Sequence, residues 1–151
     1  MLPKIGRIAL VLATGAALLV EAGDGQAASR YRRQYYSTWS YHTTTRYYYR
    51  TYYYYPTPAV TTYSYHYAIY YPSQPRYVYY YNPVSQVYWG RFEFGANGKP
   101  KGYSLLAQKD RKGKLGDIPE SAFPAPAAMP AIPESGDGEK MAAPPADLPK
   151  G

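Results

Sequence analysis

The stretch that decides the fold covers residues 47–83 and reads YYYRTYYYYPTPAVTTYSYHYAIYYPSQPRYVYYYNP. Tyr and Thr favour pleated strands, and residues 63–67 alternate with a period of two. Prolines interrupt every aromatic run, and each one removes a backbone donor and favours extended geometry. The pattern therefore predicts extended chain with transient strands and no stable helix. The five prolines are Pro56, Pro58, Pro72, Pro75 and Pro83.

The composition around this stretch predicts disorder. Residues 30–89 hold 21 of the 22 tyrosines, six arginines and no acidic residue. Residues 28–151 contain only fourteen Ile, Leu, Val and Phe together, well below the roughly 20% that ordinary folded domains reach on this count. The chain has no cysteine, so disulfides cannot replace the missing core. We therefore expect a mostly intrinsically disordered, low-complexity protein.

The amino terminus has the order of a secretory signal peptide. Two basic residues precede the uncharged run 8–20, IALVLATGAALLV, and small residues precede a cleavage site after Ala27. Val20 and Ala22 offer an alternative cut. As a helix, thirteen residues cover about 20 Å, short of the roughly 30 Å hydrocarbon core that an uncleaved anchor must span. We expect a secreted, periplasmic or envelope protein that meets the membrane only transiently, through this helix.

Charge and composition divide the chain into four predicted segments. These are the signal peptide 1–27, a Tyr/Arg-rich tract 28–86, a basic motif region 87–118 and a Pro-rich acidic tail 119–151. Formal charge is +6 over 30–89, +4 over 90–118 and −3 over 119–151, which sums to the +7 of the whole chain. The tail contains eight prolines, so we expect it to be an extended linker.

A short β-hairpin is the local structure that the sequence favours, within residues 87–107. Aromatic and apolar residues are spaced for strands over 87–94, residues 96–99 give a turn signal, and residues 103–106 can form the return strand. Pro100 and Gly102 lie where the return strand would start, which counts against it.

The residues needed for catalysis or metal binding are sparse. His42 and His66 are the only histidines, they are 24 residues apart, and neither has a nearby acid to orient it. There is no thiol, and no phosphate-binding loop ends in Gly-Lys-Ser/Thr. We therefore expect no enzymatic activity, no catalytic or metal site and no cofactor.

Arginines interleaved with tyrosines are the candidate interaction residues. Guanidinium groups stack on aromatic faces, at about 0.5 to 1 kcal/mol per exposed contact. Summed along a flexible chain, such contacts predict binding to other copies of the chain or to acidic envelope polymers. Export argues against nucleic acid as the natural partner. The candidates are Arg30, Arg32, Arg33, Tyr35, Tyr36, Arg46, Arg50, Arg76 and Trp89.

Three motifs carry a family resemblance. They are YWGR at 88–91, YSLL at 103–106 and IPESAFPAP at 118–126, followed by PPADLP at 144–149. With the signal peptide and the Tyr-rich stretch, this plan resembles a group of small secreted bacterial proteins of unknown function. The resemblance covers nearly the whole length but implies no activity, ligand or site.

The leading hypothesis is a non-enzymatic structural or interaction protein of the bacterial envelope that acts through multivalent Tyr/Arg contacts. One alternative is a polyanion- or glycan-binding module, whose affinity would fall steeply with salt, whereas aromatic self-association would tolerate salt. A second alternative is a small β-rich domain completed by a partner strand, which would unfold cooperatively.

Overall fold

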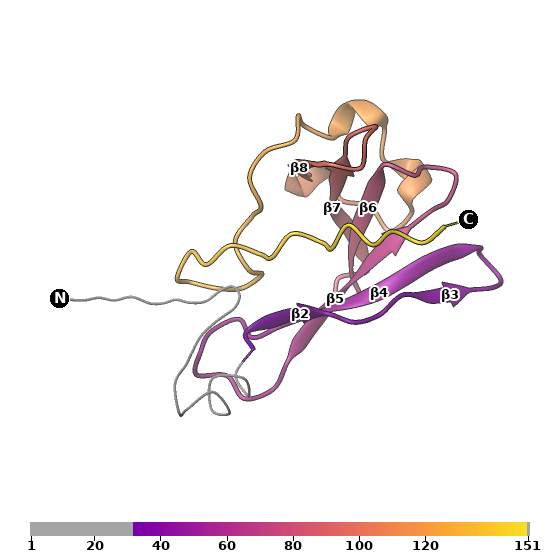
Figure 1. The fold of residues 1–151 in the computed structure, drawn as a ribbon. Helices are drawn as coiled ribbons and strands as arrows, with labels where there is room; N and C mark the ends of the chain where they lie inside the picture. The colour runs from indigo at the N-terminus through magenta and orange to yellow at the C-terminus, as the bar shows by residue number, and fades with distance from the viewer. Residues whose placement is uncertain (1–31, 151) are drawn as a thin grey trace. The chain divides into compact units, whose positions relative to one another are not determined.

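A computed structural model describes residues 32–150, and residues 34–150 belong to one compact β unit. The prediction of a mostly disordered chain is wrong, because this part of the chain forms a curled antiparallel sheet, a half-barrel (Figure 1). The predicted signal peptide with its cleavage site after Ala27, and Arg30, lie outside the described residues.

The described strands form one sheet with the order β2-β4-β5-β6-β7-β8, and β3 also pairs with β4. All pairings are antiparallel. Strand directions rotate progressively from β2 to β8, as sheet twist requires (Figure 1). The strands are β2 (Gln34–Tyr36), β3 (Ser40–His42), β4 (Tyr47–Tyr54), β5 (Ser64–Tyr70), β6 (Tyr77–Asn82), β7 (Val87–Phe94) and β8 (Pro100–Leu105).

The prolines lie between strands instead of breaking them. The connection from β4 to β5 contains Pro56 and Pro58, and the connection from β5 to β6 contains Pro72 and Pro75. Pro83 follows β6 in a turn where the Asn82 side chain accepts the backbone N–H of Val84 at 2.9 Å. Each Tyr-Pro run therefore contains a strand that ends before the proline, because proline has no backbone N–H to donate to a neighbouring strand.

β7 and β8 form a hairpin over the stretch 87–107, where one was predicted. Pro100 is the first residue of β8, a position that strands tolerate. Gly102 adopts φ 138°, and a Cβ there would lie 2.6 Å from the carbonyl oxygen of Ala127. Glycine thus allows residue 127 to approach β8, where Tyr103 and Ala127 exchange two backbone hydrogen bonds of 2.8 and 2.9 Å.

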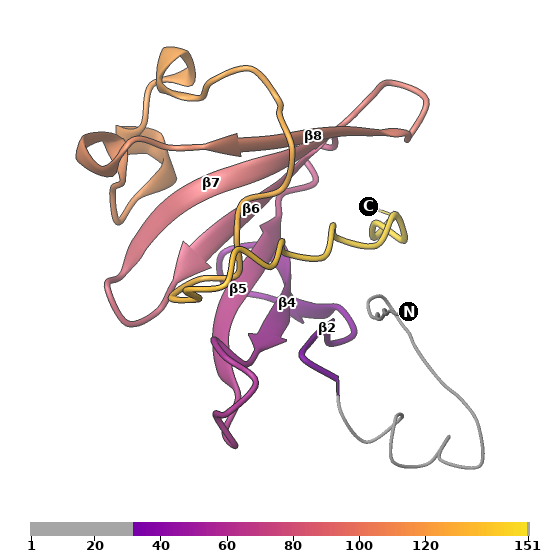
Figure 2. The same ribbon diagram turned by 90° about the vertical axis from the view of Figure 1, so that its left-hand side faces the viewer.

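One face of the sheet, which we call the tail face, has a core of tyrosine, tryptophan and phenylalanine. Tyr52, Tyr54, Tyr80 and Tyr103 are almost fully buried, together with other aromatic side chains. Ile132 and Met141 of the C-terminal segment pack into the same cluster. A buried aromatic residue removes about 150–250 Å² from water, so these rings replace the missing aliphatic side chains. The segment 127–149 lies along the hollow side of the curled sheet, between its β2–β4 and β7–β8 ends (Figures 1 and 2).

The opposite face, which we call the open face, is covered only in part. Three short 3-10 turns, η2 (Gln108–Asp110), η3 (Leu115–Asp117) and η4 (Glu120–Ala122), follow β8 and lie near β7 and β8 (Figure 2). Ile118, Leu115 and Phe123 from this segment pack with Tyr79 and Leu106. The tyrosines of β4 and β5 on this face lie beyond these turns and are half-buried or exposed.

Candidate functional site

A cavity of about 440 Å³ opens on the open face, at the end where the β3–β4 and β6–β7 turns lie. This volume is within the roughly 300–1,000 Å³ of typical ligand sites. Five phenol rings dominate its lining, so its walls combine apolar ring faces with hydroxyl groups. The lining residues are His42, Tyr47, Tyr49, Tyr67, Ile69, Tyr81, Tyr88 and Gly113.

The β3–β4 turn holds one wall of this cavity, which we call the tyrosine pocket. The backbone N–H of Arg46 donates to the carbonyl of His42 at 2.8 Å, and Arg46 adopts the left-handed φ of 57°. The Nδ1 atom of His42 lies 2.8 Å from the hydroxyl of Thr45. The His42 ring stacks on Tyr47 with centroids 5.1 Å apart. A local hydrogen bond therefore positions the His42 ring, and ring stacking positions Tyr47 against it.

Tyr88 holds the opposite wall. Its hydroxyl lies 2.8 Å from that of Tyr71, and its ring packs edge-on against Tyr81 at 5.0 Å. Its backbone N–H donates to the carbonyl of Lys112 at 2.8 Å, which fixes Gly113 at the rim. Burial raises the pKa of Tyr88 above its ordinary value, so this phenol stays neutral at physiological pH.

The charges beside the tyrosine pocket are positive. Arg46 precedes the lining residue Tyr47, and Lys112 and Lys114 flank Gly113; all three side chains are exposed. Among residues 32–150, no acidic side chain lines the pocket. A ligand with hydroxyl groups would find ring faces and phenol groups in this lining, and an anionic ligand would also find cations close to the rim.

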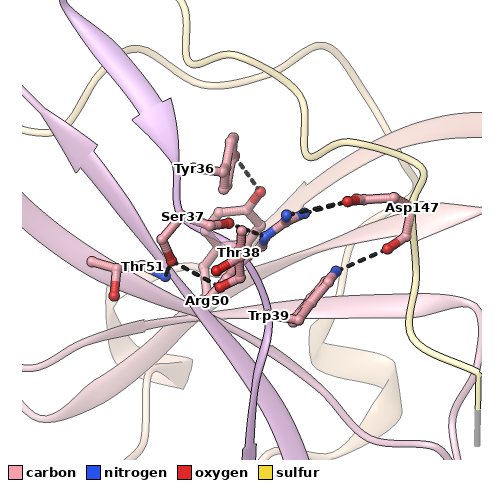
Figure 3. A network of polar contacts seen from close by, with 8 residues as sticks. Tyr36, Ser37, Thr38, Trp39, Arg50, Thr51 and Asp147 are labelled. Carbon is pink, nitrogen blue, oxygen red and sulfur yellow. Dashed lines mark hydrogen bonds and ion pairs between the residues drawn. The ribbon is translucent and has the colours of Figure 1, made fainter.

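A second group of polar contacts, on the tail face, fastens the C-terminal segment (Figure 3). The Arg50 guanidinium is 5% exposed and donates to both carboxylate oxygens of Asp147 at 2.9 and 3.3 Å. It also donates to the carbonyl of Ser37 at 2.8 Å and lies 4.5 Å from the centre of the Trp39 ring. The Trp39 indole N–H donates to the carbonyl of Asp147 at 2.9 Å. These contacts make Arg50 a structural clamp.

The predicted interaction residues do not form one cluster. Tyr35 is half-buried on the open face, whereas Tyr36 faces the tail and its hydroxyl lies 2.6 Å from that of Tyr80. Arg46 lies beside the tyrosine pocket, and Trp89 is buried in the tail-face core. The others are scattered: Arg32 is exposed and Arg33 half-buried at the start of the described residues, Arg50 is the clamp, and Arg76 lies 3.7 Å from Glu93.

The pocket residues themselves were missed as a site. The spacing of Tyr47 and Tyr49, two residues apart, could have predicted that both rings lie on one face of a strand. Joining them to Tyr67, Tyr81 and Tyr88 requires the register between strands, which no local pattern gives.

Comparison with protein-family models, with curated proteins and with solved structures finds no match to this chain. Over residues 32–150, the structure contains no helix with the length and apolar character needed to cross a membrane. In the same range, no three acidic or histidine side chains are grouped so that they could hold a metal ion.

Proposed function

We propose that this chain is a secreted, non-enzymatic β domain that binds acidic sugars of the bacterial envelope through the tyrosine pocket. The fold is a small β-rich domain, and the observation that carries the binding proposal is the phenol-lined cavity of about 440 Å³ with cations beside it. Export is supported by the sequence pattern of residues 1–27. Sugars carrying carboxylates offer apolar ring faces, hydroxyl groups and negative charge together.

Each property of such a ligand has a counterpart in the pocket. Tyr49, Tyr67 and Tyr81 present rings against which a sugar ring can stack, and their hydroxyls can donate and accept hydrogen bonds. Lys112 and Lys114 supply positive charge next to the rim. Electrostatic attraction of this kind is screened by salt, so binding to an acidic sugar should weaken as ionic strength rises.

Because the tyrosine rings of the described strands are fixed in a sheet, they do not act as collective contacts along an unfolded chain. The two histidines do not form a pair: His42 lies on the open face opposite Tyr47, whereas His66 is buried on the tail face near Tyr54.

The test is titration calorimetry of residues 28–151 with a uronic-acid disaccharide and with a neutral disaccharide of the same linkage. We expect binding of the acidic sugar and weaker binding of the neutral one. Tyr81→Ala should reduce the affinity for the acidic disaccharide about tenfold, equivalent to about 1.4 kcal/mol. Tyr41→Ala is the matched control, because Tyr41 is 47% exposed and does not line the pocket. Absence of binding, or equal losses in both variants, would refute the proposal.

A further inference from the structure

The tyrosine pocket is one end of a longer row of rings on the open face. Neighbouring rings in this row have centroids 6.3 Å apart for Tyr47 and Tyr49, 5.9 Å for Tyr49 and Tyr67, and 5.7 Å for Tyr67 and Tyr65. The row continues at 6.1 Å from Tyr65 to Tyr53 and at 4.9 Å from Tyr53 to Tyr35. We call these rings the tyrosine track: Tyr47, Tyr49, Tyr67, Tyr65, Tyr53 and Tyr35.

The strand register explains why the track is continuous. Tyr53 lies opposite Tyr65, and the smaller Thr51 lies opposite Tyr67, so the row passes from β4 to β5 and back again. Tyr47 and Tyr53 are six residues apart on β4, which at about 3.3 Å per residue corresponds to about 20 Å. The track is therefore much longer than a single sugar ring, and three of its rings also line the pocket.

The middle of the track is accessible, whereas at its β2 end the rings of Tyr35 and Tyr53 contact the ring of Tyr63 from the β4–β5 connection, with centroids 5.2 and 6.1 Å apart. Tyr65 is 44% exposed, and the other rings of the track are half-buried. The 3-10 turns that cover the open face pack against Tyr79, Tyr88 and Leu106, on the β6–β8 side of the sheet. The β6–β8 side of the open face is thus covered by the segment that contains the 3-10 turns, whereas the β2–β5 side presents tyrosine rings to solvent.

Charge indicates what the β2–β5 side of the open face can receive. Residues 32–75 contain four arginines and no Asp or Glu, and Asp147 of the tail pairs with one of these arginines, Arg50. Because Arg50 is buried on the tail face, the remaining positive charge lies close in sequence to the two ends of the track: Arg46 precedes Tyr47, and Arg32 and Arg33 precede β2, which carries Tyr35. A polymer that is negatively charged and has ring faces is complementary to this side of the face.

We infer that the tyrosine track extends the pocket into a platform for an acidic polysaccharide chain, so that the ligand is a polymer held along several sugar units and not a free mono- or disaccharide. This inference rests on the proposed function, because the pocket is one end of the platform. A single sugar unit binds in the pocket, and further units lie on Tyr67, Tyr65 and Tyr53.

The experiment measures affinity for uronic-acid oligomers from the dimer to the decamer, with three variants. Wild-type affinity should rise tenfold or more from dimer to octamer. Tyr65→Ala lies on the track and outside the pocket, so it should abolish most of this rise and leave dimer binding unchanged. Tyr81→Ala lies in the pocket and outside the track, so it should weaken binding at every length. Tyr41→Ala should match the wild type, and circular dichroism confirms that each variant is folded.

The outcomes separate the inference from the proposal on which it rests. If the dimer binds but affinity is independent of length, or if Tyr65→Ala keeps the rise, the platform is refuted and the pocket stands. If no oligomer of any length binds, the proposed function fails. If single-stranded oligothymidylate of equal charge binds as tightly as the octamer, the track is a general polyanion surface and the assignment to polysaccharide is overturned.

Discussion

Acidification should destabilise this domain through one buried histidine, His66 of β5. Its side chain is 5% exposed, its Nε2 atom lies 3.2 Å from the hydroxyl of Tyr54, and its ring packs edge-on against Trp89 at 5.5 Å. Burial lowers the pKa of His66 from 6.5 to about 4, because the aromatic surroundings disfavour the charged imidazolium. The folded domain therefore holds this histidine neutral.

The magnitude follows from linkage. The pKa is lower in the folded chain than in the unfolded chain, so the unfolded chain takes up the proton first as pH falls. The contribution of neutral His66 to the free energy of unfolding is fully present above about pH 6.5. It is lost as the pH falls toward about 4, at about 1.4 kcal/mol per pH unit. The difference of 2.5 pH units (6.5 − 4) gives a loss of about 3 kcal/mol. Below about pH 4 this histidine contributes no further change.

The assay is urea unfolding of residues 28–151 at pH 7 and pH 4.5, for the wild type, His66→Gln and the control His42→Gln. The wild type and the control should each lose about 2 to 3 kcal/mol of unfolding free energy over this interval through His66. His66→Gln should be less stable than the wild type at pH 7. On acidification its unfolding free energy should fall by about 2 to 3 kcal/mol less than that of the wild type. Protonation of carboxylates affects all three proteins alike, so the difference isolates the histidine. Equal losses in wild type and His66→Gln would refute the reasoning.

Two further substitutions test the packing of the tail face by urea unfolding. Asp147→Asn should lower the unfolding free energy by about 1 to 2 kcal/mol, because it leaves the buried Arg50 guanidinium without its carboxylate; the expected loss is modest because the Asp147 side chain is 63% exposed. An unchanged midpoint would show that the tail is held without this pair. Gly90→Ala should cost about 1 to 3 kcal/mol, because a Cβ at this position clashes with the ring and hydroxyl of Tyr103. Gly116→Ala, which meets nothing within 4 Å, should leave stability unchanged, and equal behaviour of the two variants would contradict the packing described here.

Local signals predicted one part of this fold. The hairpin of β7 and β8 is marked by a turn sequence that includes Asn97 and Gly98, and Gly98 adopts φ 79° in that turn. The alternation of β5 was visible over residues 63–67 but was expected to give only a transient strand, whereas β4 and β6 were missed because tyrosine occupies both of their faces. Tyr52 and Tyr53 are neighbours on β4, yet one is buried in the tail-face core and the other lies on the tyrosine track. Without polar residues on one face, the alternation that marks a half-buried strand is invisible.

The estimate of core size failed for a related reason. Counting Ile, Leu, Val and Phe ignores tyrosine, which is rarely treated as a core residue although its ring is as large as that of phenylalanine. In this domain some buried tyrosine hydroxyls find partners: that of Tyr52 donates to the side-chain oxygen of Gln34 at 2.6 Å, and that of Tyr79 donates to the side-chain oxygen of Gln74 at 2.8 Å. The cost of burying these two phenols is thereby offset. The buried hydroxyl of Tyr103 has no such partner among the described residues.

The candidate site was harder to predict than the fold. Of the predicted interaction residues, Arg46 lies beside the pocket and Tyr35 belongs to the track. The remaining residues of both features become neighbours only through the pairing of β4 with β5 and of β6 with β7. The composition drew attention to tyrosine and arginine side chains, but the register decides which of them become neighbours.

The clamp between Arg50 and Asp147 joins residues 97 positions apart in the chain. Ile132 and Met141 follow β8 in the chain and pack into the aromatic core of the tail face. Strands β2 to β8 without this segment would leave that core exposed to water. Contacts between such distant residues form late and slowly during folding. We therefore expect a chain that lacks the C-terminal segment to expose apolar surface on the tail face and to be prone to aggregation and proteolysis.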